Sequence, residues 1–348
     1  MKKRLMALLL SGVLAVSMFA GCGTQMDKTA TVATDGTTEI SLGVANFAAR
    51  LTQAQYDDFY VAYFGENVWR SDMYGYGTTT EDDLKASVMD SLFAMYAMKN
   101  HMADYGVEIT SEDVAAISAA AEAFIAANSA EAIEALGAER EYVEAYLELL
   151  TIQSRMYNEI IKDADTNVSD EEAKTSAYSQ VYVSKTSYTD ADGNTVEYTE
   201  EELGLLEQTV KAFAEAAKAN GLQSAADAYG YKVTTGTYNA DSTVLAEVEA
   251  ALEAMTEDGQ VSGLIELENA YYVVQMDAVV DEDATEATRQ SIISERQTTL
   301  YTEVVDGFLE EMVWEVDEKL WEQVSFDNLF TVYLPETGTE ELEATEAE

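Results

Sequence analysis

Apolar side chains recur every three or four residues along the stretch 80–114, which predicts a helix with one apolar face. That face carries Leu84, Val88, Leu92, Met95, Met98 and Met102. Thr80 is the expected N-cap, with Asp82 and Asp83 in the first turn, where acidic side chains suit the positive end of the helix dipole. Gly106 suits the left-handed conformation that commonly ends a helix. Such an apolar helix needs other segments to cover it, and we expect them to come from both ends of the chain.

The same spacing predicts further helices at 52–63, 111–127 and 138–161, with Thr110 as the cap of the second. An aromatic loop broken by glycines follows the first of them, and a short strand is expected at 40–47. Helical spacing returns at 284–322, where the apolar stripe has no partner nearby in the sequence. We therefore predict one helical domain, formed by residues 40–167 and completed by a C-terminal helix within 282–330.

Between these two parts, residues 168–281 change character. Runs of β-branched and aromatic residues predict strands at 180–188, 231–238, 261–267 and 270–279. Helical spacing predicts helices at 200–219, 224–229 and 244–255, and Asp192-Gly193-Asn194 is a strong hairpin signal. The order β-α-α-β-α-β-β indicates a small α+β domain, so the whole chain is predicted to be α+β with this domain interrupting a helical one.

The first 21 residues predict a signal peptide. Lys2, Lys3 and Arg4 precede an apolar run that is too short to span a membrane stably, and small residues then precede Cys22. This ending resembles the lipobox of bacterial lipoproteins, although Phe19 stands where leucine is usual. The resemblance implies a lipid on Cys22 and an anchor on the extracytoplasmic face of the cell membrane. An ordinary secretory signal followed by a chance cysteine is the alternative.

Composition narrows the possible partners. The chain has 19 basic and 66 acidic residues, a net charge of -47, and removing the three basic residues of the signal makes it about -50. Such a charge disfavours nucleic acid and anionic lipid, and it favours cationic clients. Residues 22–39 are expected to be a flexible tether, and the acidic tail 331–348 is expected to be disordered.

No metal or cofactor is expected. Cys22 is the only cysteine and His101 the only histidine, so zinc spacing is absent, and the acidic runs lack the pattern of an EF-hand loop. We expect His101 to be a packing residue at a helix edge. Methionines on the face of the first helix are expected to belong to the core rather than to a client-binding surface.

Two passages carry a family resemblance. The motif D-L-K-x-x-V-x-D-x-L at 83–92, followed by Y-G-V-E-I-T-S-E-D-V at 105–114, is similar to the N-terminal helical region of SurA- and PrsA-type extracytoplasmic chaperones. The α+β region resembles their parvulin-type (PpiC) prolyl isomerase domain, through residues 213–218, 236–238, 259–262 and 270–274. The resemblance covers most of residues 40–325.

The sequence departs from that family at the isomerase cleft. Parvulins carry one histidine in the first strand and another in the last, and the aligned positions here hold Gln180 and Tyr272. An aliphatic residue near Val248 also replaces the aromatic residue of the third helix. We therefore assign no catalytic residue. Isomerisation needs only a cleft that prefers the twisted imide, so residual activity stays open.

The resemblance implies a lipid-anchored folding factor, in a bacterium of the Gram-positive type, that binds unfolded or partly folded secreted polypeptides. Tyr238, Tyr271 and Val273 are the candidate client-binding residues of the parvulin-like domain. An active prolyl isomerase of the same architecture is the main alternative. A solute-binding lipoprotein is a third, but it requires two α/β lobes, and residues 40–163 show almost no strands.

Overall fold

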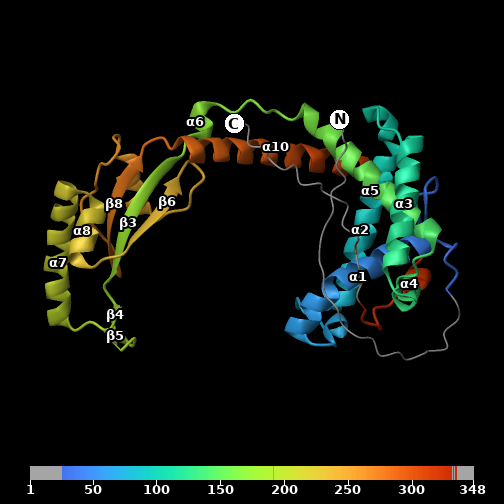
Figure 1. Ribbon diagram of the computed structural model, residues 1–348, viewed down its shortest axis with the longest axis horizontal. Coiled ribbons are helices and arrows are strands. Elements are labelled where there is room, and N and C mark those ends of the chain that lie inside the picture. Colours follow the sequence, from blue (N-terminus) through green and yellow to red (C-terminus); the bar gives the residue numbers. More distant parts are fainter. Residues whose placement is uncertain (1–25, 191, 331, 333, 335–348) are drawn as a thin grey trace, which may run out of the picture. The chain divides into compact units, whose positions relative to one another are not determined.

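The computed structural model describes residues 26–190, 192–330, 332 and 334 of the 348 (Figure 1). The chain divides into two compact units. A helical unit comprises Met1–Asp163 and Thr299–Glu348, and an α+β unit comprises Ala164–Thr298. The predicted fold class is confirmed, because segments from both ends of the chain build the helical unit and the α+β unit interrupts them. The predicted signal peptide, Cys22 and most of the acidic tail lie outside the described residues.

Among its described residues, the helical unit contains five principal helices before the α+β unit, and a small sheet. Its helices are α1 (Leu42–Phe64), α2 (Thr80–Asn100), α3 (Ser111–Ala127), α4 (Ala130–Leu136) and α5 (Arg140–Ile160). Three short 3-10 turns lie at η1 (Val68–Arg70), η2 (Met102–Tyr105) and η3 (Ile161–Asp163). The long helix α10 (Glu282–Glu310) contributes residues to both units. The strands β1 (Thr31–Thr34), β2 (Glu39–Ser41) and β9 (Glu315–Val316) form a sheet in the order β2-β1-β9, and α11 (Glu318–Trp321) follows.

Helix α2 forms as its apolar spacing predicts. Val88, Leu92 and Met98 are buried in the core of the helical unit, as are Met89 and Met95, so the methionines belong to the core. The N-cap is Thr79 rather than the predicted Thr80, because the Thr79 hydroxyl accepts from the Asp82 backbone in a capping box. The Thr80 hydroxyl instead donates to the Ser71 carbonyl at 2.9 Å.

The expected tether and the expected first strand are corrected by the structure. Residues 31–39, predicted to be part of a flexible tether, include β1 and the first residue of β2, with Val32 and Ala33 fully buried. Residues 40–47, predicted to be a strand, belong mostly to α1, which Ser41 caps. The alternation of Ile40, Leu42 and Val44 imitates one longer strand, but only Ile40 lies in β2, whereas Leu42 and Val44 are buried residues of α1.

The predicted helix over 284–322 is also interrupted. Helix α10 ends at Glu310, and the chain then extends to pair β9 with β1, Ala33 lying opposite Val316. The Asp317 backbone N–H donates to the Val32 carbonyl at 2.8 Å, and the Asp317 side chain caps α11. Pairing with β1, from the N-terminal part of the chain, therefore replaces the helix predicted beyond Glu310.

A buried polar cluster on α1 holds the segment 325–330 in place. We call Arg50, Gln53 and Asp57 the polar clamp; each is almost completely buried. Arg50 donates to the carbonyls of Ser325 at 2.6 Å and Asn328 at 3.4 Å, and its guanidinium lies over the Phe330 ring. Burial lowers the pKa of Arg50 to about 10. These bonds join two parts of the helical unit that are far apart in sequence.

Asp57 completes the polar clamp. It accepts hydrogen bonds from the Trp69 indole N–H at 2.7 Å and from the Phe330 backbone N–H at 3.2 Å. Burial raises the pKa of Asp57, and the donated hydrogen bonds oppose that rise. The clamp therefore fixes Trp69 as well as the C-terminal segment against α1.

The α+β unit has the predicted element order. Its antiparallel sheet runs β6-β3-β8-β7, formed by β3 (Ser176–Ser184), β6 (Val233–Tyr238), β7 (Ile265–Glu266) and β8 (Ala270–Ala278). The remaining elements are α6 (Asp170–Ala173), the hairpin β4 (Ser187–Thr189) and β5 (Thr195–Glu197), α7 (Glu200–Asn220), α8 (Leu222–Tyr229) and α9 (Ala246–Glu253). The predicted strand 180–188 is divided between β3 and β4, and 261–267 keeps only β7 and a bridge at Val261.

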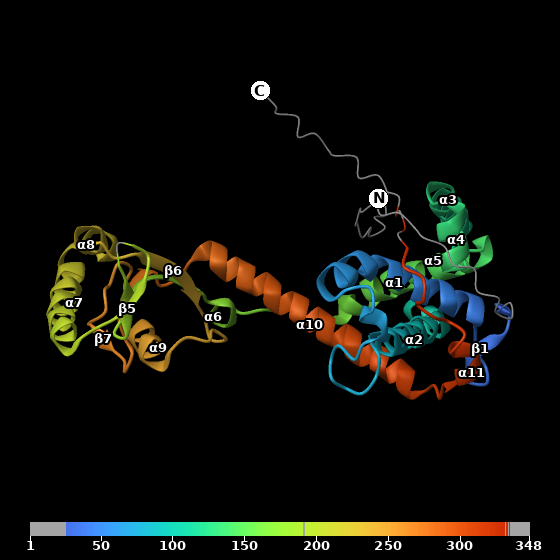
Figure 2. The same ribbon diagram turned by 90° about the horizontal axis from the view of Figure 1, so that it is seen from below.

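Opposite faces of this sheet pack against different helices. Val181 and Val273 pack with Phe213 in a core that includes residues of α7 and α8. Tyr178 and Val274 pack on the other face, in a core that includes Val248 and Leu252 of α9. Figure 1 shows α7 and α8 beside the sheet, and Figure 2 shows α9 in the view from below. Alternate residues along each strand therefore have different surroundings.

Candidate functional site

The structure brings Gln180 and Tyr272 together on the α9 face, which we define by Tyr178, Gln180 and Tyr182 of β3 with Tyr272 and Val274 of β8. In the register of β3 and β8, Gln180 lies opposite Val274 and Tyr182 opposite Tyr272. Residues directly opposite each other in an antiparallel pair share a face, so Gln180 and Tyr272 are diagonal neighbours.

The chemistry available at this pair differs from that of two imidazoles. The Gln180 amide carries no titratable proton, and burial together with the neighbouring Tyr182 raises the pKa of Tyr272. Both groups are therefore neutral near pH 7 and can exchange only hydrogen bonds with a substrate. The Tyr182 and Tyr272 rings meet edge to face, with centroids 5.3 Å apart. The site offers an aromatic wall and an amide, without an acid or base that titrates near neutrality.

The chain's single histidine lies in the helical unit. His101 stacks on the Phe308 ring with centroids 4.1 Å apart, and its Nδ1 lies 2.9 Å from Asp104. The expected packing role of this side chain agrees with these contacts. No shift of register along β3 or β8 could bring an imidazole to the α9 face.

The three predicted client-binding residues do not share a surface. Tyr238 packs on the α9 face, with its hydroxyl 3.4 Å from Glu249. Val273 is only 2% exposed in the core beneath α7 and α8, and Tyr271 is also buried, with the Lys185 ammonium over its ring. Tyr271 and Val273 are alternate residues of β8 and share the face opposite to that of Tyr238, because Tyr272 and Val274 between and after them face α9. A client-binding role for these three residues stays a prediction.

Tyr182 was missed by the sequence analysis. Its side chain is 52% exposed beside Tyr272, which makes it the more accessible aromatic residue of the pair. The signal was present in the alternation Tyr178, Gln180, Tyr182, which predicts three side chains on one face of a strand.

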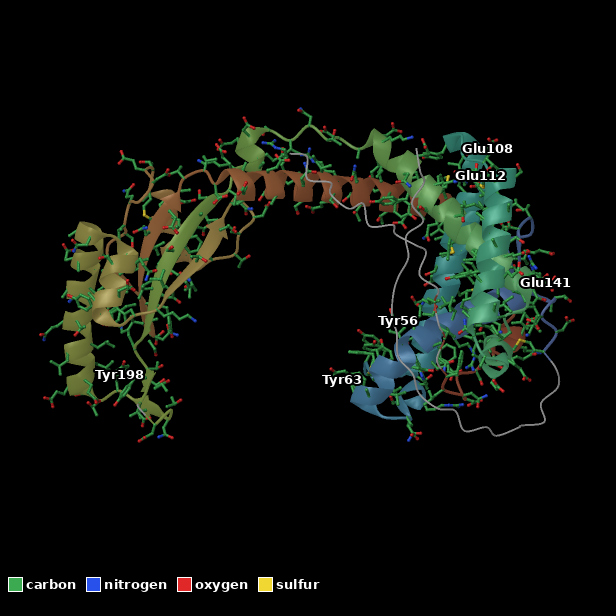
Figure 3. All side chains as sticks on the ribbon, in the orientation of Figure 1. Tyr56, Tyr63, Glu108, Glu112, Glu141 and Tyr198 are labelled. Carbon is green, nitrogen blue, oxygen red and sulfur yellow. The ribbon has the colours of Figure 1, made fainter. Side chains whose placement is uncertain are left out.

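A second candidate surface lies on the helical unit and was also missed. Six exposed rings occupy the C-terminal half of α1 and the loop that follows it. We call them the aromatic cluster: Tyr56, Phe59, Tyr63, Phe64, Tyr74 and Tyr76. Figure 3 labels Tyr56 and Tyr63 toward the same end of α1. Exposed apolar groups gathered in this way mark interaction surfaces more often than single exposed residues do.

The rings of the aromatic cluster contact one another and rest on a buried base. Phe59 and Tyr63 lie with centroids 4.7 Å apart, and Tyr56 stacks on Tyr60 at 5.3 Å. Tyr60 in turn packs on the buried Trp69 ring at 5.4 Å. Since Trp69 donates to Asp57, the polar clamp supports the cluster from below. The helical spacing of these residues was visible in the sequence, but their exposure was not.

An open groove of about 700 Å³ lies beside the aromatic cluster. It is lined by Tyr74 and Tyr76 from the loop, by Asp83 and Asp90 from α2, and by alanine and serine side chains of α2. Within the described residues, no group of three histidine, cysteine or acidic side chains could hold a metal ion. In the same part of the chain, no helix is long and apolar enough to cross a membrane.

Comparisons with known proteins bear on the α+β unit first. Residues 168–288 match the family model described as a PPIC-type PPIASE domain, which confirms the predicted parvulin-like domain. Gln180 and Tyr272, which the sequence predicts to stand at the paired histidine positions of parvulins, both lie within the matched residues. No curated protein matches the chain.

Several solved structures are similar to the chain. The foldase protein PrsA of Lactococcus lactis is 16% identical, with 85% of this chain and 99% of that chain covered and a TM-score of 0.33. PrsA of Bacillus cereus is 14% identical, with coverages of 86% and 98% and a TM-score of 0.31. A SurA-like chaperone of Campylobacter jejuni is 11% identical, with coverages of 82% and 99% and a TM-score of 0.29.

Proposed function

We propose that this protein is an extracytoplasmic folding factor that binds unfolded or partly folded exported polypeptides. The observation that carries the proposal is the aromatic cluster, six solvent-exposed rings on the helical unit of a chain that also has a PPIC-type domain. The foldase and chaperone names of the similar solved structures agree with it.

The physical basis is the burial of apolar surface. Fully burying one large apolar side chain is worth about 1.5–3 kcal/mol, so a segment that covers three rings gains several kcal/mol before its ordering cost. Hydrophobic contact is not directional and therefore tolerates many client sequences. Unfolded chains expose such side chains and folded ones bury them, which gives the surface its selectivity.

The PPIC-type domain is proposed to add a second contact surface without significant catalysis. Gln180 and Tyr272 provide hydrogen-bonding groups and Tyr182 provides an exposed ring, whereas an imidazole pair is missing. An active isomerase remains the second candidate, because a cleft needs only to prefer the twisted imide over the planar forms. The solute-binding alternative is not supported, since every strand pair between the described elements is antiparallel.

Two assays separate these candidates. The purified chain, without its first 21 residues, is added to a denatured client and light scattering is followed; we expect aggregation to be suppressed. The same protein is then tested for cis-to-trans conversion of a proline tetrapeptide, where we expect a rate close to the uncatalysed one. Turnover comparable to that of a parvulin with both histidines, lost in Tyr272→Ala and accompanied by no effect on aggregation, would establish the isomerase instead.

Anchoring through Cys22 is part of the proposal and has its own test. A lipid on the cysteine would hold the protein on the outer face of the membrane. Cys22→Ala should release the protein from membranes or leave the signal peptide uncleaved. A variant that stays membrane-bound with a normally processed N-terminus would show that Cys22 is not the anchor.

A further inference from the structure

The groove beside the aromatic cluster has aromatic and acidic walls but no basic side chain. Tyr74 and Tyr76 line it together with Asp83 and Asp90, and the remaining lining residues are small alanines and serines of α2. Tyr76 is 79% exposed, so its ring is available to a ligand. A groove of this composition combines two features that attract cations, the faces of aromatic rings and carboxylates.

The loop that carries the two tyrosines is held in a defined conformation. The Asp72 carboxylate accepts the backbone N–H groups of Tyr76 at 3.0 Å and of Gly77 at 2.9 Å. The Tyr60 and Tyr74 hydroxyls lie 3.3 Å apart, which joins the loop to α1. The two tyrosine rings are stacked with centroids 6.0 Å apart. Because the loop is already ordered, binding a ligand there costs less conformational entropy.

The negative charge of the groove is not neutralised from within the described chain. One oxygen of Asp83 accepts from the Thr78 hydroxyl at 2.6 Å, whereas Oδ2 is removed from solvent and has no hydrogen-bond partner among the described residues. Lys85, on the same helix, donates to the Trp321 and Val324 carbonyls at 3.0 and 2.6 Å. Arg70 forms an ion pair with Asp327. The basic side chains nearest in sequence are thus engaged elsewhere.

We propose that this groove binds a lysine or arginine side chain of an unfolded client segment, while apolar residues of the same segment contact the aromatic cluster. The inference rests on the proposed function and names the chemistry of its clients. The cation would lie against the exposed tyrosine rings and pair with the carboxylates of α2. A net charge of -47 on the chain favours the approach of such clients from a distance.

Three synthetic peptides test the proposal directly. They share one unstructured apolar sequence and differ at a central position, which is lysine, norleucine or glutamate, and their dissociation constants are measured by fluorescence anisotropy with the chain lacking its first 21 residues. We expect the lysine peptide to bind about tenfold more tightly than the norleucine peptide, a difference of about 1.4 kcal/mol. The glutamate peptide should bind most weakly. The preference should shrink at about 0.5 M salt because screening weakens exposed charge pairs.

Variants assign the preference to the groove. Asp90→Asn with Tyr76→Ser should abolish the preference for lysine, and the exposure of both side chains protects the fold, which circular dichroism would check. Ser87→Lys places a lysine of this protein in the groove, where it would compete with the client's cation, and it should also abolish the preference for the lysine peptide. Glu112→Gln, an exposed charge in the first turn of α3, is the matched control and should keep the preference.

The outcomes separate this inference from the proposed function. Equal affinity for the lysine and norleucine peptides, with aggregation still suppressed, overturns the inference and leaves the folding factor intact. A preference for lysine that survives both groove variants places the cation site elsewhere and also overturns it. Failure of all three peptides to bind, together with no suppression of aggregation, contradicts the proposed function itself.

Discussion

The aromatic cluster of the helical unit and the α9 face of the α+β unit are both rich in tyrosine, but they hold their rings differently. On the α9 face, Tyr178 is buried with residues of α9, and Tyr182 alone is strongly exposed. In the cluster, six rings face solvent above a base formed by Tyr60 and Trp69. The number of tyrosines therefore does not identify a contact surface, because the rings that a neighbouring helix covers are unavailable to a client.

The largest expected effect concerns the support beneath the aromatic cluster. Asp57→Ala removes the acceptor of the Trp69 and Phe330 N–H groups and leaves the Arg50 charge less compensated. We expect the free energy of unfolding of the helical unit to fall by about 3–5 kcal/mol. All three tryptophans, Trp69, Trp314 and Trp321, lie in that unit, so tryptophan fluorescence during urea unfolding reports on it alone.

The destabilisation should be specific to Asp57 and not a general effect of substitutions on α1. Gln55→Ala, at a half-buried position of the same helix, is the control and should change the free energy of unfolding by less than about 1 kcal/mol. If Asp57→Ala left the tryptophan transition unchanged, the polar clamp would not be what supports the cluster.

The next effect concerns the cluster itself. Replacing Phe59 and Tyr63 by serine removes two exposed rings and leaves the core intact, since Tyr63 is 74% exposed. We expect about tenfold more protein to be needed for the same suppression of client aggregation, with an unchanged melting temperature. Tyr188→Ser with Leu205→Ser removes two exposed apolar groups from the α+β unit and should have little effect. If both double variants lost the same amount of aggregation suppression, the aromatic cluster would not be a specific client-binding surface.

The α9 face can be tested by restoring the missing side chains. Gln180→His with Tyr272→His places two imidazoles on diagonal neighbours of one sheet face. We expect prolyl isomerase activity on a tetrapeptide to rise about fivefold, equivalent to about 1 kcal/mol, because the family's cleft carries histidine at both positions. Each single variant should show a smaller increase in isomerase activity than the double variant. A parent protein already as active as the double variant would mean that Gln180 and Tyr272 suffice for catalysis.

The smallest effect concerns acid stability. Arg155 pairs with Asp113 of α3, and this pair together with the Thr110 hydroxyl holds the pKa of Asp113 well below the usual range of an aspartate. Asp113 forms a capping box with Thr110. In the α+β unit, Glu202 forms a capping box with Thr199, and these hydrogen bonds lower the pKa of Glu202. A lowered pKa in the folded state gives stability that is present above the unfolded pKa and is lost as the pH falls through the folded one.

Asp113→Asn should therefore destabilise the helical unit at pH 7 by about 0.5–1 kcal/mol. The difference from the parent protein should persist down to the ordinary aspartate pKa of about 3.9 and shrink progressively at lower pH, as measured by tryptophan fluorescence in urea. Glu112→Gln, at the adjacent and exposed position, is the control. A destabilisation that is the same at every pH would show that the lost interaction is not the charge of Asp113.

Elements whose signals are local could be predicted from the amino-acid sequence. Apolar spacing predicted α3 and α7 almost to the residue, and Thr110 caps α3 as expected, because these signals need no distant partner to be visible. It also predicted α2, but the helix ends at Asn100, before the expected stop at Gly106. The same reasoning predicted the order of elements in the α+β unit and the return of the C-terminal segment to the helical unit. The alignment placed Gln180 and Tyr272 at one site, and the register of β3 and β8 agrees.

Which side chains are covered could not be predicted, because it depends on contacts between distant segments. The strand β1 is too short to be recognised alone, and it exists because β2 and β9, the latter some 280 residues away, pair with its two edges. Arg50 and Asp57 look like ordinary surface charges of a helix until residues 325–330 bury them. The rings of Tyr63 and Tyr76 have the spacing and composition of a core, yet no described element covers them. Burial depends on contacts between segments that are far apart in the sequence. Local spacing and composition carry no information about those contacts.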